Sequence, residues 1–540
     1  MDSEEKKRRQ FIKVLLAEAM RVFSVIAIVV VTTLLAMGFS FSTEGGIEQT
    51  GLMQIHSQPT GATVTLDGSA LFSRTNTSRT MSAGEHHLKL SRDGYDTWEK
   101  TVKMYSGVLI RMYYPRLFLQ NRVAESVLDL ASGNTGTKEL EFYAPSTSRN
   151  YIIYAEQNAA EWRLLDLRGD EVKMSVLDLS GILPGMVVET AASGSASSSV
   201  GGSTVSGGAS GNSASGKTDQ NGAKQVTTPQ YRFDGSIEMI KWSSNDEKIL
   251  VKVAYEGKSE WVLVNLRNVA ASLNLTKTFG LNFDQVEMID NSASQLYALA
   301  NHRLYRVNVA GEVLSRILVD NIESFVNRGA NVLYLTMADT KTETRTIGAY
   351  RDDEKGGTAL LTVPAKEPVK IALSRYFDED YIAYTVGNSL TVYYGTLPSY
   401  NENREKSVLE DLKKLVEDKE LEEVPTSFSA SRDGEYVVAR NGQKFMVTDL
   451  DMGDLWTYEA ATSELNWLDA SMMYAVKDGE ILVWDFDGTN LRNLAESAKT
   501  AKDEAIEAAN FPVMLTANNR WIYYLVEGVN TYTLTRERVQ

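Results

Sequence analysis

The sequence predicts an all-β protein behind a single N-terminal membrane-spanning helix. Residues 22–41 contain no charged side chain, and a helix of about 20 residues matches the roughly 30 Å hydrocarbon core of a bilayer. Farther along, short β-rich units recur eight times, with starts about 36–55 residues apart once one long insertion is set aside. That spacing is typical of four-stranded propeller blades. We therefore expect a β-propeller of seven or eight blades at residues 118–540, and a smaller β-rich unit precedes it at residues 52–113.

The charges around the apolar run predict its orientation. Glu44 and Glu48 follow it, whereas the preceding residues include Lys6, Lys7, Arg8, Arg9, Lys13 and Arg21. Basic residues next to a membrane helix favour the cytoplasmic side. We therefore expect residues 1–21 to be a cytoplasmic stub, residues 22–41 to be a retained single-pass anchor in the cell membrane, and the bulk of the chain to be extracytoplasmic.

Two alternatives compete with a retained anchor. A cleaved secretory signal also has a basic leader and an apolar stretch, and Ala36-Met37-Gly38 loosely resembles a cleavage site. The apolar run, however, exceeds the usual signal core of about 7–15 residues. The second alternative is a buried helix of a soluble protein. An acylated lipoprotein anchor is excluded because the chain contains no cysteine.

Composition excludes several classes of function. The formal net charge is −16, and residues 1–21 carry six basic and four acidic groups, so the remainder carries −18. An acidic ectodomain is a poor ligand for phosphate backbones, so we expect no nucleic-acid partner. The absence of cysteine excludes disulfides and thiolate metal sites. A cysteine-free protein outside the membrane is more typical of bacteria than of eukaryotic secretion.

The region at residues 52–113 has the signals of a small β domain. Residues 62–66 alternate apolar and polar side chains, and Asp67-Gly68 then supplies a hairpin turn. Residues 83–90 and 97–104 are expected to be further strands. The region resembles the PEGA domain of bacterial and archaeal envelope proteins in Pro59-x-Gly61-Ala62, Val64-x-Leu66-Asp67-Gly68, Gly84-x-His86-x-Leu88 and Gly94-Tyr95. Thr60 replaces the family's glutamate. The resemblance implies a small β-sandwich at residues 52–113. It also implies structural display or contact with protein or wall, and not catalysis.

The eight β-rich units predict the blades. They contain apolar runs at residues 150–155, 248–253, 295–299, 332–335, 381–385, 436–439, 473–476 and 521–525. The units resemble the WD40-like repeats of TolB-type propellers. The match is best at Ser429-x-Ser431-x-Asp433-Gly434 and weaker at Ser243-x-Asn245-Asp246 and Thr516-x-Asn518. The family's usual turn proline is missing from all three. We expect the Asp-Gly pair to form the tight turn between blade strands.

Two segments interrupt the repeat. Residues 190–228 consist mainly of Gly, Ser, Thr and Ala, and we expect a disordered loop there because such a composition cannot bury a core. Residues 402–423 are predicted to be an amphipathic helix, with Leu409, Leu412, Leu415 and Val416 on one face. Packing on the propeller rim is the expected role of this helix, and docking of a partner is the alternative.

No motif assigns catalysis. Residues 211–218 satisfy the phosphate-loop pattern, but they lie in Gly/Ser filler without the flanking strand and helix, so we interpret the match as chance. The four histidines are His56, His86, His87 and His302. We expect the first three on strands of the sandwich and the last in a hairpin turn. Metallopeptidase and serine-hydrolase motifs are missing.

Two acidic turns are the remaining candidates for a site. They are Asp485-x-Asp487-Gly488-x-Asn490 and Asp449-x-Asp451-x-Gly453-Asp454. Oxygen ligands on a tight glycine loop suit Ca²⁺, but the full calcium loop is not reproduced, and Asp and Gly are common in turns for conformational reasons alone. We favour ordinary blade turns. We assign no catalytic, cofactor-binding or metal-ligating residue and expect no cofactor.

The predicted function is that of a non-enzymatic, membrane-anchored binding or scaffold protein of the cell envelope. Its propeller would present a face to an envelope protein or a glycan. The alternative is a propeller enzyme that cleaves surface polysaccharide, which needs paired carboxylates facing the central channel. A signalling sensor is disfavoured because residues 1–21 are too short for an output domain.

Overall fold

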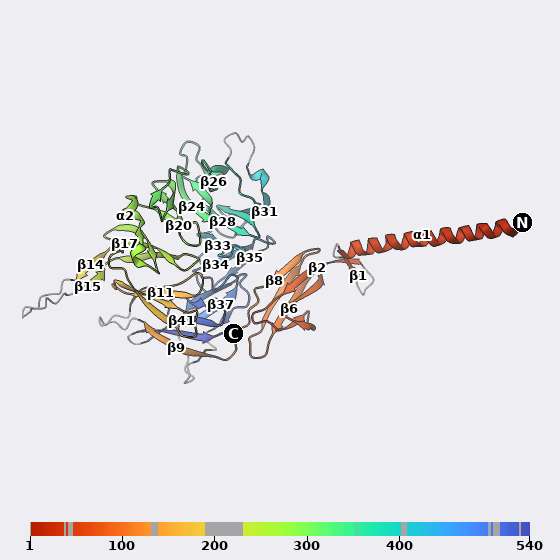
Figure 1. Cartoon of the computed structure of the whole chain (residues 1–540), viewed down its shortest axis with the longest axis horizontal. Coiled ribbons are helices and arrows are strands. Elements are labelled where there is room, and N and C mark those ends of the chain that lie inside the picture. Colours follow the sequence, from red (N-terminus) through yellow and green to blue (C-terminus); the bar gives the residue numbers. More distant parts are fainter. Residues whose placement is uncertain are drawn as a thin grey trace, which may run out of the picture.

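The computed structural model describes residues 2–540 except 37–38, 42–46, 131–138, 190–229, 353, 401–407, 495–497, 500–507 and 529–530. An N-terminal helix, a small sandwich of two sheets and a large ring of sheets follow one another in the chain. In Figure 1 the sandwich lies between the helix and the ring.

The N-terminal helix α1 (Asp2–Ala36) protrudes from the rest of the protein. Its segment Leu15–Leu34 is long and apolar enough to cross a membrane, and none of it is buried against the protein. The hydroxyls of Ser24, Thr32 and Thr33 each donate to a carbonyl one turn earlier. Hydroxyls bonded in this way need no water, as an apolar environment requires.

The predicted helix bounds are wrong at both ends. The helix begins well before residue 22, so residues 2–21 are helical, and it ends at Ala36 and not at residue 41. Phe39–Phe41 instead form strand β1, which pairs antiparallel with β2 (Ile47–Ile55). Absence of charge identifies an apolar run, but it does not show where backbone pairing to a sheet replaces the helix.

The sandwich contains two sheets. One has the order β1-β2-β5, with β8 (Leu109–Met112) also paired to β2; β5 is Thr77–Ser82. The other has the order β4-β3-β6-β7, which are Ser69–Arg74, Thr63–Leu66, Gly84–Ser91 and Trp98–Met104. Three predicted strands correspond to β3, β6 and β7. Asp67 and Gly68 turn the chain with φ of 48° and 80°. The apolar side chains between the sheets include Met53, Ile55, Val64, Leu88, Leu90 and Trp98.

Eight sheets make up the described part of the ring, and we number them as blades. Blades 1 to 4 are β10 (Leu140–Pro145), β11 (Tyr151–Glu156), β12 (Glu161–Asp166), β13 (Lys173–Asp178); β16 (Ser236–Trp242), β17 (Lys248–Tyr255), β18 (Lys258–Asn265), β19 (Leu273–Asn274); β20 (Gln285–Met288), β21 (Gln295–Ala300), β22 (Arg303–Asn308), β23 (Val313–Leu314); and β24 (Ile322–Arg328), β25 (Asn331–Thr336), β26 (Thr344–Tyr350), β27 (Thr358–Pro364).

Blades 5 to 8 complete the ring. They are β28 (Val369–Tyr376), β29 (Glu379–Val386), β30 (Ser389–Gly395), β31 (Lys413–Glu420); β32 (Ser427–Ala430), β33 (Tyr436–Asn441), β34 (Lys444–Asp449), β35 (Leu455–Glu459); β36 (Met472–Lys477), β37 (Glu480–Asp485), β38 (Arg492–Asn493); and β40 (Met514–Leu515), β41 (Trp521–Glu527), β42 (Tyr532–Arg538), β9 (Arg122–Leu130). Smaller elements are η1 (Val269–Ala271), α2 (Leu275–Phe279), η2 (Val408–Asp411), β39 (Ala498–Lys499) and the ribbon β14 (Met186–Glu189) with β15 (Gln230–Phe233).

Buried clusters between successive blades show that the ring is closed. Blades 1 and 2 share a cluster that contains Ile153 and Val251, and each further blade shares one with the next. The last cluster joins blade 8 to blade 1 through Tyr523 and Tyr154. Strand β9, from before blade 1, pairs with β42 and supplies the fourth strand of blade 8, and β39 pairs with the other edge of β9. The fold is therefore a β-propeller, and its described residues form eight blades.

The eight predicted apolar runs are found in the strand at the second position of each blade, or extend into it. In blade 7 the described residues at the first position form a bridge from Trp467 to Met473 and no strand, so β36, β37 and β38 occupy the second, third and fourth positions. The strand at the second position lies between two neighbouring blades, so both of its faces are buried; four consecutive residues of β11 and of β25 are buried, for example. Burial on both faces produces a continuous apolar run and not an alternating one. The outer strand β13, in contrast, is mostly exposed.

The recurring Ser-x-Asp motif forms the turn between the first and second strands. In blade 6, Ser431 Oγ donates to Asp433 Oδ1 at 2.8 Å and accepts from the Tyr436 amide at 2.9 Å. The fourth residue, Gly434, has a φ of 93°. The same hydroxyl bonds recur at Ser243 in blade 2 and Thr516 in blade 8. The motif therefore closes a blade turn.

The predicted helix at residues 402–423 is wrong where the structure describes it. Lys413–Glu420 form β31, the outer strand of blade 5, after the short helix η2. Val416 pairs with Val392 of β30, and two register irregularities flank this pair. The unpaired edge of β30 favours a strand there, and this tertiary pairing outweighs the helical spacing of the leucines. The predicted disordered loop at residues 190–228 lies outside the described residues.

The propeller has two distinct faces. Antiparallel strands alternate in direction, so the turns after the first and third strand positions of every blade emerge on one face. The turns after the second strand position, and the connections between blades, emerge on the other. The sandwich contacts the first, which we call the docked face, and we call the opposite one the free face. In Figure 1 the ribbon β14–β15, on a connection between blades, lies across the ring from the sandwich.

Candidate functional site

Buried polar contacts join the sandwich to the docked face. The Trp98 indole Nε1 donates to Asp485 Oδ2 at 2.8 Å. Beside it, Lys100 Nζ forms an ion pair with Asp487 Oδ2 at 2.5 Å, and both side chains are less than 10% exposed. Burial raises the pKa of Asp485 to about 7, although Lys100 lies nearby. The acidic turn of blade 7 thus forms the binding surface for strand β7 of the sandwich.

Aromatic rings surround the Lys100 ammonium. Its Nζ lies 4.7 Å from the ring centroid of Phe486 and 5.6 Å from that of Trp456, and it donates to the Tyr114 hydroxyl at 2.9 Å. Burial lowers the pKa of Lys100, but the Tyr114 oxygen and the Asp487 carboxylate more than offset this, so the pKa lies above its usual value. The lysine stays charged, and the rings stabilise it further.

A second group of contacts joins the sandwich to blades 7 and 8. Arg116 follows the last strand of the sandwich, and its Nη2 forms a buried ion pair with Asp469 of blade 7. Asn519 of blade 8 donates to Gln58 Oε1 at 3.0 Å. Arg492 donates to the Thr97 carbonyl at 2.8 Å. These contacts hold the sandwich at several separated points, which fixes its orientation.

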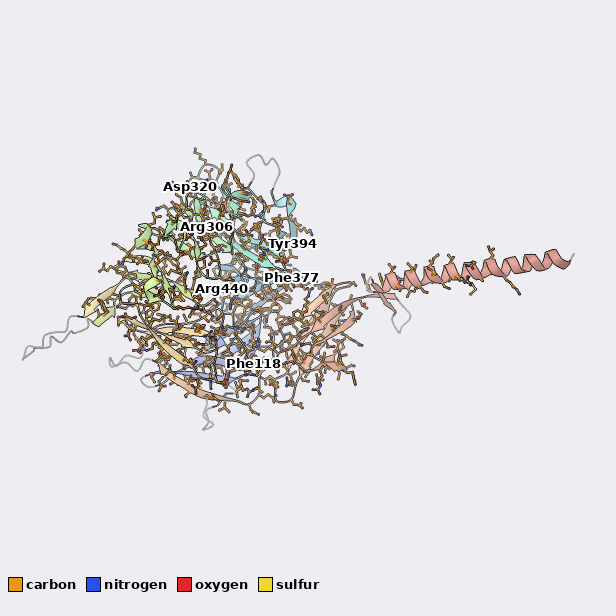
Figure 2. The ribbon with its side chains drawn as sticks, in the orientation of Figure 1. Phe118, Arg306, Asp320, Phe377, Tyr394 and Arg440 are labelled. Atoms are coloured by element: carbon orange, nitrogen blue, oxygen red, sulfur yellow. The ribbon has the colours of Figure 1, made fainter. Side chains whose placement is uncertain are left out.

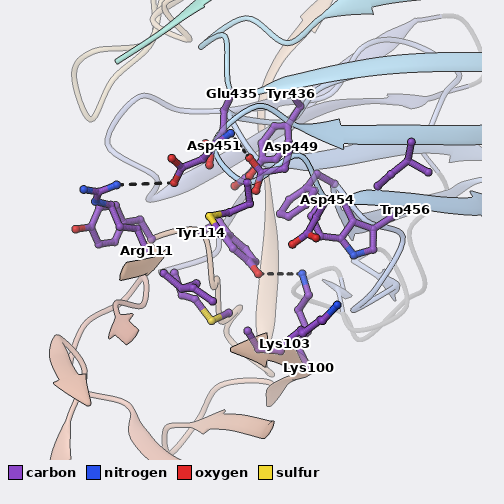
Figure 3. A pocket seen from close by; sticks show the side chains of 18 of the residues that line it. Lys100, Lys103, Arg111, Tyr114, Glu435, Tyr436, Asp449, Asp451, Asp454 and Trp456 are labelled. Carbon is purple, nitrogen blue, oxygen red and sulfur yellow. Dashed lines mark hydrogen bonds and ion pairs between the residues drawn. The ribbon is translucent and has the colours of Figure 1, made fainter. Parts of the chain in front are cut away.

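A cavity of about 430 Å³ lies beside these contacts, between the sandwich and blades 5 to 7 (Figure 3). Its walls come from β7, β8 and the turns of the docked face. Phe377, 62% exposed, is one of these residues and lies at the side of the ring nearest the sandwich (Figure 2). The Arg111 guanidinium carbon is 5.0 Å from the centre of the Phe377 ring.

The cavity walls carry more acidic than basic groups. The acidic residues are Glu85, Glu435, Asp449, Asp451 and Asp454, and the basic ones are Lys100, Lys103 and Arg111. Asp487, outside the lining, already pairs with Lys100. Arg111 Nη1 is 3.8 Å from Asp451 Oδ2 (Figure 3). The cavity therefore suits a cation better than an anion.

Crowding of the carboxylates perturbs their protonation. Burial, followed by the charges of Asp449 and Asp433, raises the pKa of Glu435 to about 8. Burial also raises the pKa of Asp449 to about 6. At neutral pH, Glu435 therefore holds a proton that an exposed glutamate would have lost.

The predicted acidic turns do come together at this junction. The turn at 485–490 joins β37 to β38 and the turn at 449–454 joins β34 to β35, so the interpretation as blade turns is confirmed. Within the described residues, no group of three or more acidic or histidine side chains is placed to hold a metal ion.

The other sequence candidates lie elsewhere. His302 is in the turn between β21 and β22, as predicted, and His86 Nδ1 lies 2.7 Å from Asp67 Oδ2 within the sandwich. The phosphate-loop match at residues 211–218 falls outside the described residues. Sequence reasoning missed Lys100. A usable signal was present, because Lys100 interrupts the apolar face formed by Trp98, Val102 and Met104 in strand β7.

The family comparison now identifies the sandwich. The profile of the PEGA domain family matches residues 50–115. Residues 50–115 are a PEGA domain. This PEGA domain supplies β7, β8 and Lys100 to the junction, and the expected range of 52–113 lies within the matched one. A search of the curated proteins finds no match to the chain.

Solved structures similar to the chain include a WD40 domain, a propeller and a lyase. The C-terminal WD40 domain of Sif2 is 12% identical, with a TM-score of 0.40, and the match covers 76% of this chain and 98% of that one. The Dos1 propeller is 10% identical, with a TM-score of 0.40 and coverage of 76% and 94%. An oligogalacturonate lyase in complex with manganese is 12% identical, with a TM-score of 0.34 and coverage of 55% and 88%. Our fold assignment rests on the strand order and the closed ring of cores.

Proposed function

We propose that this protein is a membrane-anchored scaffold of the cell envelope, in which the PEGA domain holds the propeller and the free face binds an envelope protein or a glycan. The observation that carries the proposal is the buried polar junction. Because Trp98, Lys100 and Arg116 fix the PEGA domain on the docked face, the opposite face is left for a partner.

The N-terminal helix supports a membrane location. The segment Leu15–Leu34 is apolar and none of it is buried within the protein. A continuous apolar surface of this length needs a cover, and a bilayer provides one of the right thickness. The basic residues that precede the segment favour a cytoplasmic N-terminus. We therefore propose that the PEGA domain and the propeller lie outside. We propose that the helix is retained as an anchor.

Catalysis on polysaccharide is the less favoured function. That alternative needs paired carboxylates facing the central channel. Three carboxylates with raised pKa, Glu435, Asp449 and Asp485, lie at the domain junction, where the PEGA domain packs against the propeller. We therefore propose a non-enzymatic role.

Site-directed photo-crosslinking on intact cells tests the proposal that the free face binds a partner. A photoreactive residue replaces Gln443 or Lys477, which are exposed near free-face turns, and Phe72 of the PEGA domain serves as the control position. We expect the two free-face positions to give the same specific adduct and Phe72 to give none. No specific adduct at either free-face position, together with turnover of wall fragments, would overturn the proposal.

Protease shaving of whole cells tests the topology separately. We expect external protease to release fragments of the propeller while residues before the apolar segment stay protected. Protection of the whole chain would contradict an extracytoplasmic location, and a mature protein that begins after the apolar segment would show that the helix is cleaved.

A further inference from the structure

Arginine side chains from three blades and from the PEGA domain boundary converge on the docked face. Arg149, Arg328 and Arg432 belong to the first turns of blades 1, 4 and 6, and Arg116 follows the PEGA strands. Arg328 Nη1 donates to the Arg432 carbonyl at 2.8 Å although blades 4 and 6 are not neighbours. First turns of separate blades thus meet near the axis of the ring.

Arg116 carries two buried donors without an acceptor. The residue is 5% exposed, and its Nη2 pairs with Asp469. Its Nε and Nη1 have no hydrogen-bond partner among the described residues. Buried donors are rarely left unpaired in folded proteins, so these two point to an acceptor that the chain itself does not supply.

Arg149 belongs to the same group. Its Nη1 donates to Asn519 Oδ1 at 3.3 Å, Asn519 donates to Gln58 at 3.0 Å, and Gln58 forms a β-bridge with Arg116. These contacts form one arc, with Arg149 at one end and Arg116 at the other. Burial, and then the positive charges of Arg116 and Arg432, lower the pKa of Arg149, whereas Asp469 acts in the opposite direction. The guanidinium groups are therefore close enough to repel one another.

The nearby carboxylates do not neutralise these arginines. Asp469 is paired with Arg116, and Asp433 accepts a hydrogen bond from the Ser431 hydroxyl. Asp246 and Asp433 attract Arg432 electrostatically, yet neither Arg149 nor Arg432 lies within ion-pair distance of a carboxylate in the described part of the chain. Unpaired cations and unsatisfied donors thus occur together.

We propose that Arg116, Arg149 and Arg432 bind a phosphate group near the axis of the propeller. Guanidinium groups donate well to phosphate oxygens, and three of them from separate elements suit a tetrahedral anion better than a planar carboxylate. Because Arg116 follows the PEGA strands whereas the other two belong to blades, the bound phosphate joins the PEGA domain to the propeller. The scaffold role does not require this ligand, so the two proposals stand or fall separately.

The test uses the full chain in detergent micelles, with inorganic phosphate as the probe and chloride at matched ionic strength as the reference. Phosphate is expected to raise the thermal midpoint of the wild-type protein by several degrees, and calorimetry is expected to show stoichiometric binding. Arg432→Gln removes an exposed guanidinium that has no ion pair, and Arg149→Gln is the second variant. Each is expected to weaken phosphate binding at least about tenfold, as for loss of a charge-assisted contact.

Arg520→Gln is the matched control, because it removes an exposed positive charge from the blade 8 turn on the same face. It should retain wild-type affinity. The proposal is overturned if wild type does not respond to phosphate, if Arg432→Gln and Arg149→Gln both bind like wild type, or if Arg520→Gln loses as much affinity as they do.

The source of the phosphate is tested with glycerol 3-phosphate and a short poly(glycerol phosphate). Binding of inorganic phosphate alone supports the site and identifies a free anion as its ligand. Binding of the esters with equal or higher affinity also supports the site and indicates a phosphate carried by a larger molecule.

Discussion

The ring of blades and the domain junction are held together by different chemistry. Between blades, side chains such as Ile153, Val251 and Tyr523 form continuous apolar clusters. Between the PEGA domain and the propeller, the central contacts are the Lys100–Asp487 and Arg116–Asp469 ion pairs. Apolar burial is non-directional, whereas a buried ion pair requires one geometry and is costly when broken. Burial of apolar surface therefore stabilises the ring, whereas the buried ion pairs fix the orientation of the PEGA domain on the propeller.

Removal of Lys100 should have the largest effect at the junction. Lys100→Ala leaves Asp487 buried and unpaired, beside Asp485, and breaking a buried pair costs about 3–5 kcal/mol. We expect the PEGA domain to undock while both domains stay folded. Trypsin cleavage after Arg116 measures this, because that residue is 5% exposed when the domains are docked. Unchanged resistance to trypsin would show that the pair does not hold the junction.

An apolar truncation in the ring should lower the stability of the propeller without changing how docking of the PEGA domain depends on pH. Leu250→Ala empties part of the cluster between blades 2 and 3, and such truncations cost about 2–5 kcal/mol. We expect the thermal midpoint of the propeller to fall while the pH dependence of docking stays as in wild type. A changed pH profile would mean that the ring and the junction are not energetically separate.

The next largest effect should be the pH dependence of docking, which distinguishes the junction from the ring. Glu435 has a pKa raised to about 8, so its contribution to stability is present below the pKa of an exposed glutamate and is lost as the pH rises toward 8. Docking should weaken between about pH 4.5 and 8, by at most about 1.4 kcal/mol per pH unit. Trypsin protection of wild type against pH measures this loss.

Glu435→Gln should flatten that profile and strengthen docking at high pH, because the substituted amide cannot ionise. Glu422→Gln, an exposed glutamate at the free face, is the matched control and should follow wild type. Identical profiles for all three proteins would contradict the assignment of the pH dependence to Glu435.

An exposed ion pair in the same domain should have the smallest effect. Lys89 and Glu99 are 3.5 Å apart, and each side chain is about half exposed. Lys89→Ala should change stability by less than about 1 kcal/mol and should leave trypsin protection of Arg116 intact. A loss comparable to that of Lys100→Ala would indicate that charge alone, and not burial, determines docking.

The sequence predicted the ring better than the junction. The strand at the second position of each blade is buried on both faces, so it produces an apolar run that can be recognised without knowledge of its neighbours. Lys100 and Asp487 interact across 387 positions of the chain, and no local pattern pairs a lysine in a PEGA strand with a turn of blade 7. The Ser-x-Asp turns were predictable for the same reason as the strands, because their hydrogen bonds are local.

The two errors have a common origin. In residues 402–423 the leucine spacing favours a helix, and in residues 37–41 the absence of charge favours a longer membrane span. In both places a neighbouring strand offers backbone pairing, from β30 to β31 and from β2 to β1. Local propensity is a weak constraint where such an edge is available.

The central claim is that the PEGA domain holds the propeller in one orientation. Because the chain contains no cysteine, Phe72→Cys with Lys477→Cys provides two unique sites for spin labels, one on the PEGA domain and one near a free-face turn. Pulsed electron resonance on the full chain should give a single narrow distance distribution, which broadens when Lys100→Ala is added. A broad or multimodal distribution in the protein that retains Lys100 would contradict the account.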